Sequence, residues 1–323
     1  MSGPLLVGID VGGTKLAGIA VDGERVVAQV HRPLSRADVA GQVVEVARDL
    51  AGPLGGRPDA IGIAVPGQVD TRRGIVELAV NLGVRDLPLG SLVADALDAP
   101  TAVEHDARAV AGWLVDEGGD PAPVTLAYLS VGTGISAGVV VDGVVLRGTA
   151  GLAGEIGHVV ADPSGERCAC GLAGCLETVA SGPSVARAAR RLVASGAASS
   201  LPADPTSEQV FRAAGNGDAL ACDVVDRATT HLAAAIRGLA LAYGIGRIVV
   251  GGGVARAGRA FAEPLLAAVE RERAASGLVE RALRDVPIEV LEDDRPIGAL
   301  GAVALARRHI SDSAPGGGEV GTR

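Results

Sequence analysis

Residues Val11–Gly23 read VGGTKLAGIAVDG, and residues Val131–Gly143 read VGTGISAGVVVDG. The two stretches align without a gap, and seven of their positions are identical. Each follows an apolar run, Leu5–Ile9 or Val124–Leu129, and each ends in an Asp-Gly pair, which favours a hairpin turn. Chance matching in a chain rich in alanine, glycine and valine is the alternative explanation. We interpret the repeat as one β-hairpin unit used twice, at the start of each of two similar domains.

Elsewhere, apolar runs of strand length alternate with helical periodicity, which indicates an α/β fold. The predicted strands are Leu5–Asp10, Leu16–Val21, Arg25–Val30, Ala60–Val65, Val124–Leu129 and Arg247–Val250, and the predicted helices are Gln42–Leu50, Ala107–Val115, Pro183–Ser195, Asp218–Tyr243, Gly258–Ala275 and Gly298–His309. We expect residues 1–118, completed by a helix at 298–310, to form one lobe and residues 119–297 the other, with the ligand in a cleft between them. The Gly/Ser/Pro-rich stretch 311–323 predicts a disordered tail.

The composition argues against several classes of function. The chain has 323 residues, a net charge of −9 and only 2% aromatic residues, which disfavours a nucleic-acid surface. No apolar run approaches the roughly 18–20 residues of a membrane span, and the chain starts without a basic leader pattern. We therefore expect a cytoplasmic protein with no membrane partner.

Three of the four cysteines lie within the segment GEIGHVVADPSGERCACGLAGCLE, residues 154–177. In a reducing compartment, clustered cysteines are metal ligands more often than disulfides. Three thiolates and one imidazole make a tetrahedral zinc set of the closed, structural kind, and the candidate ligands are His158, Cys168, Cys170 and Cys175. A core histidine is the alternative for His158. The isolated Cys222 is predicted to be a buried core thiol.

Three short glycine turns follow predicted strands and are candidates for binding the phosphates and adenosine of a nucleotide. Their residues are Gly12, Gly13, Thr14 and Lys15, then Gly132, Thr133 and Gly134, and then Gly251, Gly252 and Gly253. Consecutive amides without side chains form anion nests, and Lys15, the only lysine of the chain, suits a phosphate. Asp10, at a strand end, is a candidate for Mg²⁺. The pattern is neither a Walker loop nor a dinucleotide fingerprint, and plain turns are the alternative.

Asp106 is the candidate catalytic residue. It follows the short apolar segment Ala102-Val103 and precedes the predicted helix Ala107–Val115, so it lies at a strand-to-helix junction. A helix cap is one explanation for an aspartate in this place. The functional explanation is a general base that accepts a hydroxyl proton during phosphoryl transfer.

Together these residues resemble the ROK family (repressors, open reading frames and kinases), within the actin-like, ribonuclease H-like ATPase fold. The resemblance spans nearly the whole chain, and the zinc segment is its most specific part. The motifs that carry it are Asp10-Val-Gly-Gly-Thr-Lys15, Pro66-Gly67, Asn81-Leu82, Asp106, Gly132-Thr-Gly134, Gly154-Glu-Ile-Gly-His158, Cys168-x-Cys170-Gly-x-x-Gly-Cys175-Leu-Glu177, Gly251–Gly253 and Gly298-Ala-Leu-Gly-Ala302.

The resemblance implies an ATP-dependent hexose kinase that uses Mg²⁺ and carries a structural Zn²⁺. It places the first two glycine turns at the phosphates of ATP and the third near adenosine. It makes Asp106 the base acting on the sugar 6-hydroxyl. The residues that it assigns to sugar binding are Gly67, His105, Asp106, Glu155, His158 and Glu177. Relatives of this kind commonly form dimers or tetramers, so we expect a homo-oligomer.

One segment departs from the family pattern and leaves the sugar open. Kinases of the family usually carry Asn-Asp-Ala-Asn where this chain has His105-Asp106-Ala107-Arg108. The asparagine replaced by His105 typically binds sugar hydroxyls. Glucose is the expected substrate, and N-acetylmannosamine, N-acetylglucosamine, kanosamine or a cyclitol is the alternative. A non-catalytic sugar-binding protein and a transcriptional repressor are the remaining alternatives, and the early first strand leaves no room for a repressor's N-terminal winged helix.

Overall fold

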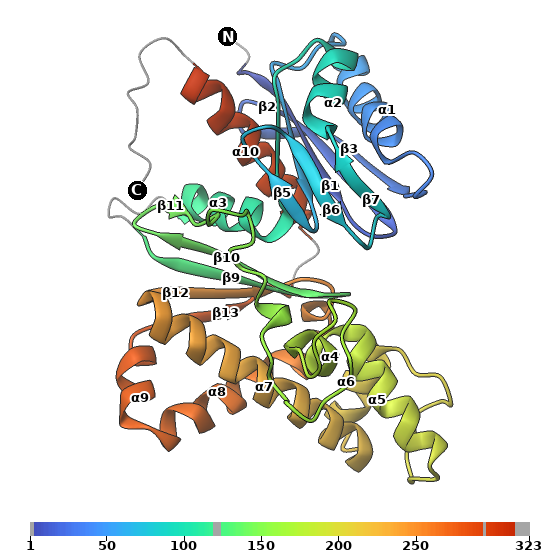
Figure 1. The fold of residues 1–323 in the computed structure, drawn as a ribbon, viewed down its shortest axis with the longest axis vertical. Helices are drawn as coiled ribbons and strands as arrows, with labels where there is room; N and C mark the ends of the chain where they lie inside the picture. Colours follow the sequence, from blue (N-terminus) through green and yellow to red (C-terminus); the bar gives the residue numbers. More distant parts are fainter. Residues whose placement is uncertain (1–2, 119–123, 293–294, 314–323) are drawn as a thin grey trace. The chain divides into compact units, whose positions relative to one another are not determined.

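The computed structural model describes residues 3–118, 124–292 and 295–313 of the chain (Figure 1). The chain divides into two compact units, each with its own sheet. The first unit comprises Met1–Pro121, Val145–Ala153 and Arg295–Arg323, and the second comprises Ala122–Val144 and Gly154–Asp294. The chain therefore enters the second unit, returns briefly to the first, and ends in the first.

The first unit is built on a five-stranded sheet with the strand order β3-β2-β1-β4-β8. β1 and β2 form the predicted antiparallel hairpin, β2 pairs with β3 in the same way, and β4 and β8 extend the sheet in parallel. The strands are β1 (Leu5–Val11), β2 (Lys15–Asp22), β3 (Arg25–Pro33), β4 (Ala60–Val65) and β8 (Thr101–His105). The carboxyl ends of the parallel strands β1, β4 and β8 share one edge of this sheet, where Asp10 and His105 lie.

Helices cover both faces of the first sheet. α1 (Val39–Ala51) and α2 (Leu89–Leu97) pack on one face in the large apolar core, and α3 (Asp106–Gly118) and α10 (Ile297–Ser313) pack on the other. A 3₁₀ turn (η1, Gly52–Leu54) follows α1, and a small antiparallel sheet with the order β5-β6-β7 precedes α2. Its strands are β5 (Gln68–Asp70), β6 (Ile75–Ala79) and β7 (Val84–Leu87).

Glycines let α10 sit directly on the backbone of the sheet. A Cβ atom at Gly8 would lie 2.3 Å from the carbonyl oxygen of Ala299, and a Cβ at Gly62 would lie 1.8 Å from that of Ala302. On its other side, α10 approaches α3 so closely that a Cβ at Gly301 would lie 2.7 Å from backbone atoms of that helix. These contacts explain the Ala299–Ala302 part of the motif as a packing requirement: the C-terminal helix completes the core of the first unit.

The second unit repeats the architecture of the first. Its sheet has the order β11-β10-β9-β12-β13, with an antiparallel β9–β10 hairpin and parallel β12 and β13. The strands are β9 (Leu126–Val131), β10 (Ile135–Val141), β11 (Val144–Val145), β12 (Arg247–Gly251) and β13 (Ile288–Val290). In both units the second hairpin strand lies outside the first, and later strands add on the opposite side. The equivalence confirms the duplicated hairpin and the α/β fold predicted from the repeat.

The helices of the second unit pack mainly on one another around the long α7, and Figure 1 shows α7 and α8 beside β12 and β13. α7 starts at an Asp218 cap and ends at Gly244 in the left-handed conformation, which fits the predicted helix. The elements are η2 (Ile156–His158), α4 (Leu176–Ala180), α5 (Gly182–Ala194), α6 (Ser207–Gly215), α7 (Ala219–Tyr243), η3 (Ala255–Ala257), α8 (Arg259–Ala275) and α9 (Gly277–Leu283).

Three local expectations need correction. Cys222 is exposed rather than buried, because it lies on the outer face of α7, where its thiol donates to the Ala214 carbonyl oxygen at 3.4 Å. The predicted strand at Val124–Leu129 is shifted and runs from Leu126 to Val131. α10 continues to Ser313, so the first three residues of the expected tail are helical; the remainder, residues 314–323, lies outside the described residues.

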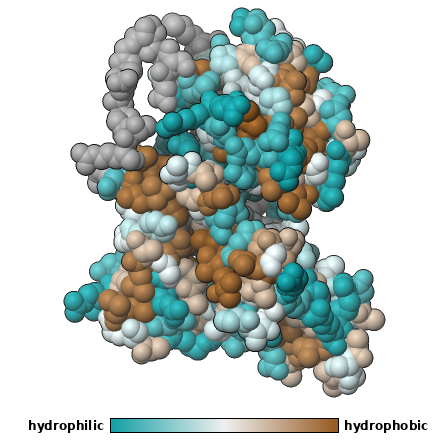
Figure 2. All heavy atoms as spheres, in the orientation of Figure 1, coloured by the Kyte–Doolittle hydropathy of each residue, from teal (hydrophilic) through white to brown (hydrophobic). Residues whose placement is uncertain are grey.

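Hydrophilic and hydrophobic side chains are interspersed over the visible face of each unit in Figure 2. Arginines pair with carboxylates at many surface positions, for example Arg212 with Glu208 and Arg259 with Glu263 along single helices. Within the described part of the chain, no helix is long and apolar enough to cross a membrane.

Candidate active site and metal centre

The first glycine turn joins β1 to β2 in the first unit. Asp10 is partly buried near the end of β1, and the Gly12 amide donates to the Lys15 carbonyl oxygen at 2.9 Å, which closes the turn. Gly12 and Gly13 are partly buried, while Thr14 and Lys15 are exposed. The turn therefore offers side-chain-free amides, a hydroxyl and an ammonium at one strand end, the groups that bind a phosphate.

Asp106 begins α3 directly after β8, and it lies close enough to Asp10 for the two carboxylates to interact. Burial, and then the charge of Asp106, raise the pKa of Asp10 to about 7, while Lys15 opposes the shift. About a third of the Asp106 side chain is exposed, and its Oδ1 lies 3.3 Å from Nδ1 of the buried His105. Two neighbouring carboxylates, one of them poorly solvated, make a place where a divalent cation would be stabilised.

Beneath Asp106, a buried ion-pair network holds the junction of β8 and α3. The Glu104 carboxylate accepts from Arg108 Nε at 2.8 Å, from Arg147 Nε at 2.6 Å and from the His105 amide at 2.8 Å. Burial alone would raise the pKa of Glu104, but Arg108 and Arg147 outweigh it and hold the pKa below its usual value. Thr71 adds a hydroxyl donor at 3.2 Å.

The same network fixes the segment Val145–Ala153 to the first unit. Arg108 Nη1 donates to the carbonyl oxygens of Gly151 at 2.9 Å and Ala153 at 3.1 Å. Ala153 is the last residue of this segment before Gly154, where the chain enters the second unit. Arg108 therefore fixes the segment to α3, the helix that begins at Asp106.

Gly67 follows β4 and has a backbone role that no other residue could fill. Its φ angle is +97°, and a Cβ there would lie 2.3 Å from the carbonyl oxygen of Leu78 in β6. Both the left-handed conformation and the close approach demand glycine. Its place in a sugar pocket stays a prediction.

In the second unit, the two remaining glycine turns lie side by side. Gly132–Gly134 connects β9 to β10, and Gly251–Gly253 follows β12. A Cβ at Gly132 would lie 3.4 Å from the amide nitrogen of Gly253, and Gly252, with φ of +94°, packs against the backbone of Val131. The two turns therefore bring Gly132–Gly134 beside Gly252 and Gly253, which are at least partly exposed, whereas Gly251 is buried.

Glu177, near the start of α4, lies against the Gly132–Gly134 turn. Its Oε2 accepts from the Ile135 amide at 3.1 Å, and a Cβ at Gly134 would lie 2.6 Å from the same oxygen. Glu155, by contrast, precedes the 3₁₀ turn that contains His158. The structure thus brings Glu177 to a predicted nucleotide turn as well as to the cysteine segment.

The four candidate zinc ligands come together in the second unit. Their ligand atoms all lie within 4.8 Å of one another. Cys170 Sγ and Cys175 Sγ are 3.5 Å apart, and Cys168 Sγ lies 3.6 Å from His158 Nδ1. A tetrahedral site with Zn–S bonds of about 2.3 Å places its sulfurs roughly 3.8 Å apart, so the cluster has the spacing of a closed four-ligand zinc site.

Tight turns bring these ligands together. The Cys168 amide donates to the Leu172 carbonyl oxygen at 2.7 Å around Gly171, which has φ of +99°. Gly174 has φ of +75°, and a Cβ there would overlap the Asp162 carbonyl oxygen. Burial raises the pKa of the Cys175 thiol to about 12 in the absence of a cation, so a bound cation would be needed to hold this sulfur as a thiolate.

The sequence located most of these groups but missed two features. It did not identify the Glu104 network, although Glu104 and Arg108 have the i, i+4 spacing of a helical ion pair. Arg147 lies 43 residues from Glu104 in the chain, and no local signal connects them. The contact of Glu177 with the Gly134 turn was likewise invisible without the fold.

The sequence model of the ROK family matches residues 6–309. This chain belongs to the ROK family. It is 36% identical over 281 residues to a glucokinase of Halalkalibacterium halodurans, covering 82% of this chain and 85% of that protein. It is 32% identical to an N-acetylmannosamine kinase of Escherichia coli O139:H28, covering 93% of this chain and 97% of that protein.

Solved structures agree with this membership. A ROK family glucokinase from Streptomyces griseus, crystallised with glucose and AMPPNP, superposes with a TM-score of 0.79 and 27% identity. The match covers 94% of this chain and 99% of the other. The duplicated actin-like ATPase fold expected from the sequence is therefore confirmed.

Proposed function

We propose that this ROK protein is an ATP-dependent sugar kinase that phosphorylates the 6-hydroxyl of a hexose, with glucose as its substrate. The observation that carries the proposal is the β8–α3 junction. There Asp106 is partly exposed, lies beside His105 and shares the electrostatic environment of Asp10. The glucokinase relatives support glucose.

Asp106 acts as the general base. As the sugar oxygen forms its bond to the transferred phosphorus and the bond to the leaving nucleoside diphosphate breaks, the hydroxyl proton passes to the Asp106 carboxylate. His105 is buried against that carboxylate and limits its orientation. A base held in this way acts on a positioned hydroxyl rather than on water.

The glycine turns and Asp10 serve the nucleotide. Lys15 and the amides from Gly12 onward bind phosphate oxygens, and Asp10 holds Mg²⁺ directly or through water. Mg²⁺ supplies the positive charge that offsets the developing charge on the phosphates. Burial and the charge of Asp106 raise the pKa of Asp10, and a cation bound beside these carboxylates would favour the ionised form.

In the second unit, Zn²⁺ has a structural role. Held by His158, Cys168, Cys170 and Cys175, it would fix a loop that has little core of its own. His158 then presents a rigid ring next to Glu155 for sugar binding. No open coordination position remains for catalysis when all four ligands are protein groups.

Purified protein tested with Mg-ATP and a sugar panel tests the proposal. We expect ADP release with glucose and none with 6-deoxyglucose, which lacks the attacked hydroxyl. Asp106→Asn should lower kcat by about 10²–10⁴-fold, the usual contribution of a general base. Asp95→Asn, at an exposed position of α2, is the matched control and should keep full activity. Turnover of 6-deoxyglucose, or substantial turnover by Asp106→Asn, would refute the assignment.

A kinase for a modified sugar is the second candidate, and His105 favours it. This residue replaces the usual asparagine, and the similar N-acetylmannosamine kinase spans nearly all of the chain. The same panel should therefore include N-acetylmannosamine, N-acetylglucosamine, kanosamine and a cyclitol. A higher kcat/KM for one of these than for glucose would replace the first proposal. Sugar binding without ADP release across the panel would indicate a non-catalytic protein.

We also propose that the protein is a cytoplasmic homo-oligomer, a dimer or tetramer, with no nucleic-acid partner. The thiol-rich cluster suits a reducing compartment, and the acidic chain disfavours nucleic acid. Light scattering on the purified protein measures the oligomeric state. A monomer at micromolar concentration, or tight salt-sensitive binding of DNA, would contradict these proposals.

A further inference from the structure

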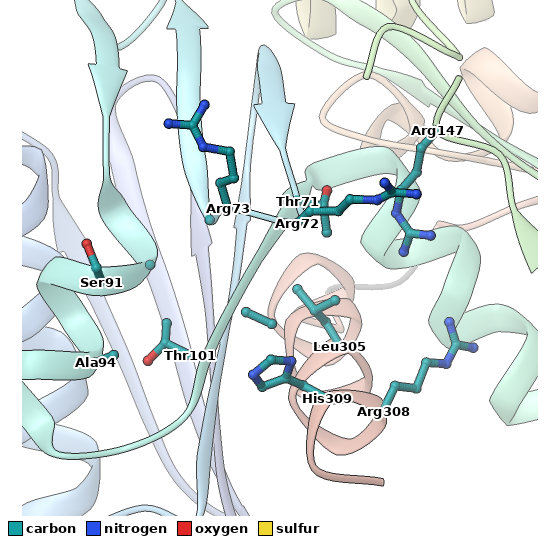
Figure 3. Close-up of a pocket in the computed structure, with 13 residues that line it drawn as sticks. Thr71, Arg72, Arg73, Ser91, Ala94, Thr101, Arg147, Leu305, Arg308 and His309 are labelled. Carbon is teal, nitrogen blue, oxygen red and sulfur yellow. The ribbon is translucent and has the colours of Figure 1, made fainter. Parts of the chain in front are cut away.

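An arginine-rich cavity of about 340 Å³ lies within the first unit, away from the glycine turn (Figure 3). It is bordered by the start of β8, the first turns of α2, the loop after β5 and the C-terminal part of α10. Asp106 follows the opposite end of β8, so this cavity is separate from the candidate catalytic junction. Its size is within the range of small-molecule sites.

The charges around this cavity have one sign. Among the described residues, its lining contains no carboxylate, although the chain as a whole carries a net charge of −9. The basic lining residues are Arg72, Arg73, Arg147, Arg308 and His309. Three hydroxyls, from Thr71, Ser91 and Thr101, complete the polar part of the wall.

The carboxylates behind the wall neutralise this charge only in part. Arg73 has Asp70 at 3.9 Å, Arg308 has Asp116 at 2.7 Å, and Arg147 shares Glu104 with the buried Arg108. Arg72 forms no ion pair with any residue that the structure describes. Four arginines of the lining and the buried Arg108 behind it share three carboxylates among the described residues, so two of these five positive charges, one of them on Arg72, have no carboxylate of their own.

The positions of the side chains favour one bound group. The side chains of Arg72 and Arg147 both line the cavity, and Figure 3 shows that Arg73 turns away from them. Two like charges that line one cavity repel each other, and a bound anion would offset this repulsion. Gly90 and Ser91, in the first turn of α2, also line the cavity, so the positive end of this helix dipole lies at its wall.

We propose that this cavity binds the phosphate group of a small phosphorylated molecule, at a site distinct from the catalytic one. A phosphate monoester carries about two negative charges at neutral pH, which would offset the excess positive charge of the lining. Arginine forks bind phosphate oxygens in pairs, and the threonine and serine hydroxyls suit the hydroxyls of a polar remainder such as a sugar. The site does not depend on the proposed kinase activity.

Arg72 is the residue to change in a test. It is exposed and has no ion pair within the described part of the chain, so we expect Arg72→Gln to remove the charge without disturbing the fold. Arg147 is unsuitable because it also holds Glu104 beneath the catalytic junction. Arg85→Gln is the matched control: Arg85 is an exposed arginine of β7 in the same unit and does not line the cavity.

The experiment is isothermal titration of the full, zinc-loaded chain, without nucleotide or Mg²⁺ and at constant ionic strength. The two probes are inorganic phosphate and glucose 6-phosphate. We expect Arg72→Gln to weaken binding by about tenfold relative to wild type, and Arg85→Gln to leave it unchanged. Any binding at the catalytic site is common to all three proteins and cancels in the comparison.

The two probes separate the sources of phosphate. Equal Arg72-dependent affinity for both indicates a site for phosphate itself, and tighter Arg72-dependent binding of glucose 6-phosphate indicates a sugar monoester. Equal affinity of wild type and Arg72→Gln for each probe, or no binding of either probe to wild type, would overturn the proposal. Neither readout needs turnover, so loss of the kinase proposal would leave this result standing.

Discussion

Replacing Arg108 with methionine should destabilise the first unit far more than removing an exposed arginine. The Arg108 side chain is completely buried, and its partner Glu104 is 2% exposed. Arg108→Met leaves that carboxylate with Arg147, whose side chain is 43% exposed, and leaves the carbonyls of Gly151 and Ala153 without their donor. Breaking a buried ion pair by removing one partner costs about 3–5 kcal/mol, and we expect a loss in this range.

The chain provides both a reporter and a control. Trp113 is the only tryptophan, and it lies in α3, the helix that carries Arg108, so its fluorescence during urea unfolding follows the first unit. Arg212 and Glu208 form an ion pair with the same i, i+4 spacing on α6, but both side chains are 67% exposed. Arg212→Met should change stability by less than about 0.5 kcal/mol, as exposed pairs do.

A double-mutant cycle tests the cause. If the loss comes from an unpaired buried charge, Glu104→Gln with Arg108→Met should cost about 1–3 kcal/mol less than the sum of the single changes. Additive losses, or an Arg108→Met loss as small as that of Arg212→Met, would refute the buried-pair explanation. They would also remove the proposed link between Arg108 and the Gly151–Ala153 carbonyls.

The destabilisation caused by Arg108→Met should become smaller at low pH. Although burial opposes it, the arginines lower the pKa of folded Glu104 below its ordinary value of 4.5. A carboxylate with a lowered folded pKa contributes stability that is complete above its unfolded pKa and is lost as the pH falls through the folded value. The stability difference between wild type and Arg108→Met should therefore be largest near pH 7 and should narrow below about pH 4.5.

Three further predictions concern the charge, metal and packing of the two units. Because the folded pKa of Asp10 is raised to about 7, Asp10→Asn in EDTA should become more stable relative to wild type as the pH rises from about 4 to 7, by at most roughly 4 kcal/mol. Urea unfolding measures this, and a stability difference between the two proteins that stays constant over that pH range would contradict it. Cys170→Ser should lose the single zinc ion per chain that mass spectrometry should detect in wild type, and it should weaken sugar binding more than nucleotide binding. Cys222→Ser should keep the zinc and both affinities. Equal loss of sugar and nucleotide affinity in Cys170→Ser would argue against a role of the zinc segment in sugar binding. Gly62→Ala places a Cβ against a carbonyl oxygen of α10 and should lower stability by about 3 kcal/mol or abolish folding. Gly238→Ala, where a Cβ would meet open space on α7, should raise stability by about 0.5–1 kcal/mol. Similar thermal midpoints for the two variants would show that α10 can shift to accept the added Cβ.

The sequence predicted features with local signals and missed those that depend on packing. The Asp-Gly turns and apolar runs identified both hairpins, and the close spacing of Cys168, Cys170 and Cys175 identified the cluster. The small β5–β7 sheet was not predicted, because its strands are three to five residues long and half exposed. The strand order could not be predicted either, because parallel neighbours such as β1 and β4 are joined only through long connections.

His105 and Arg108, the two residues of the 105–108 segment that depart from the Asn-Asp-Ala-Asn pattern of the family, have different roles in the structure. From the sequence, both His105 and Arg108 suggested an altered sugar pocket. Arg108 is completely buried and bonded to Glu104 and two backbone carbonyls. Where the family pattern has an asparagine, this chain therefore has one partner of an internal ion pair. We therefore expect a change there to affect how α3 is held rather than which hydroxyls it meets. His105 remains in contact with the proposed base, so we propose that any substrate selection by this segment comes from His105. His105→Asn should therefore move the sugar preference toward that of the family pattern while leaving the stability contributed by Arg108 intact. A panel of kcat/KM values unchanged by His105→Asn would place the determinants of the sugar elsewhere.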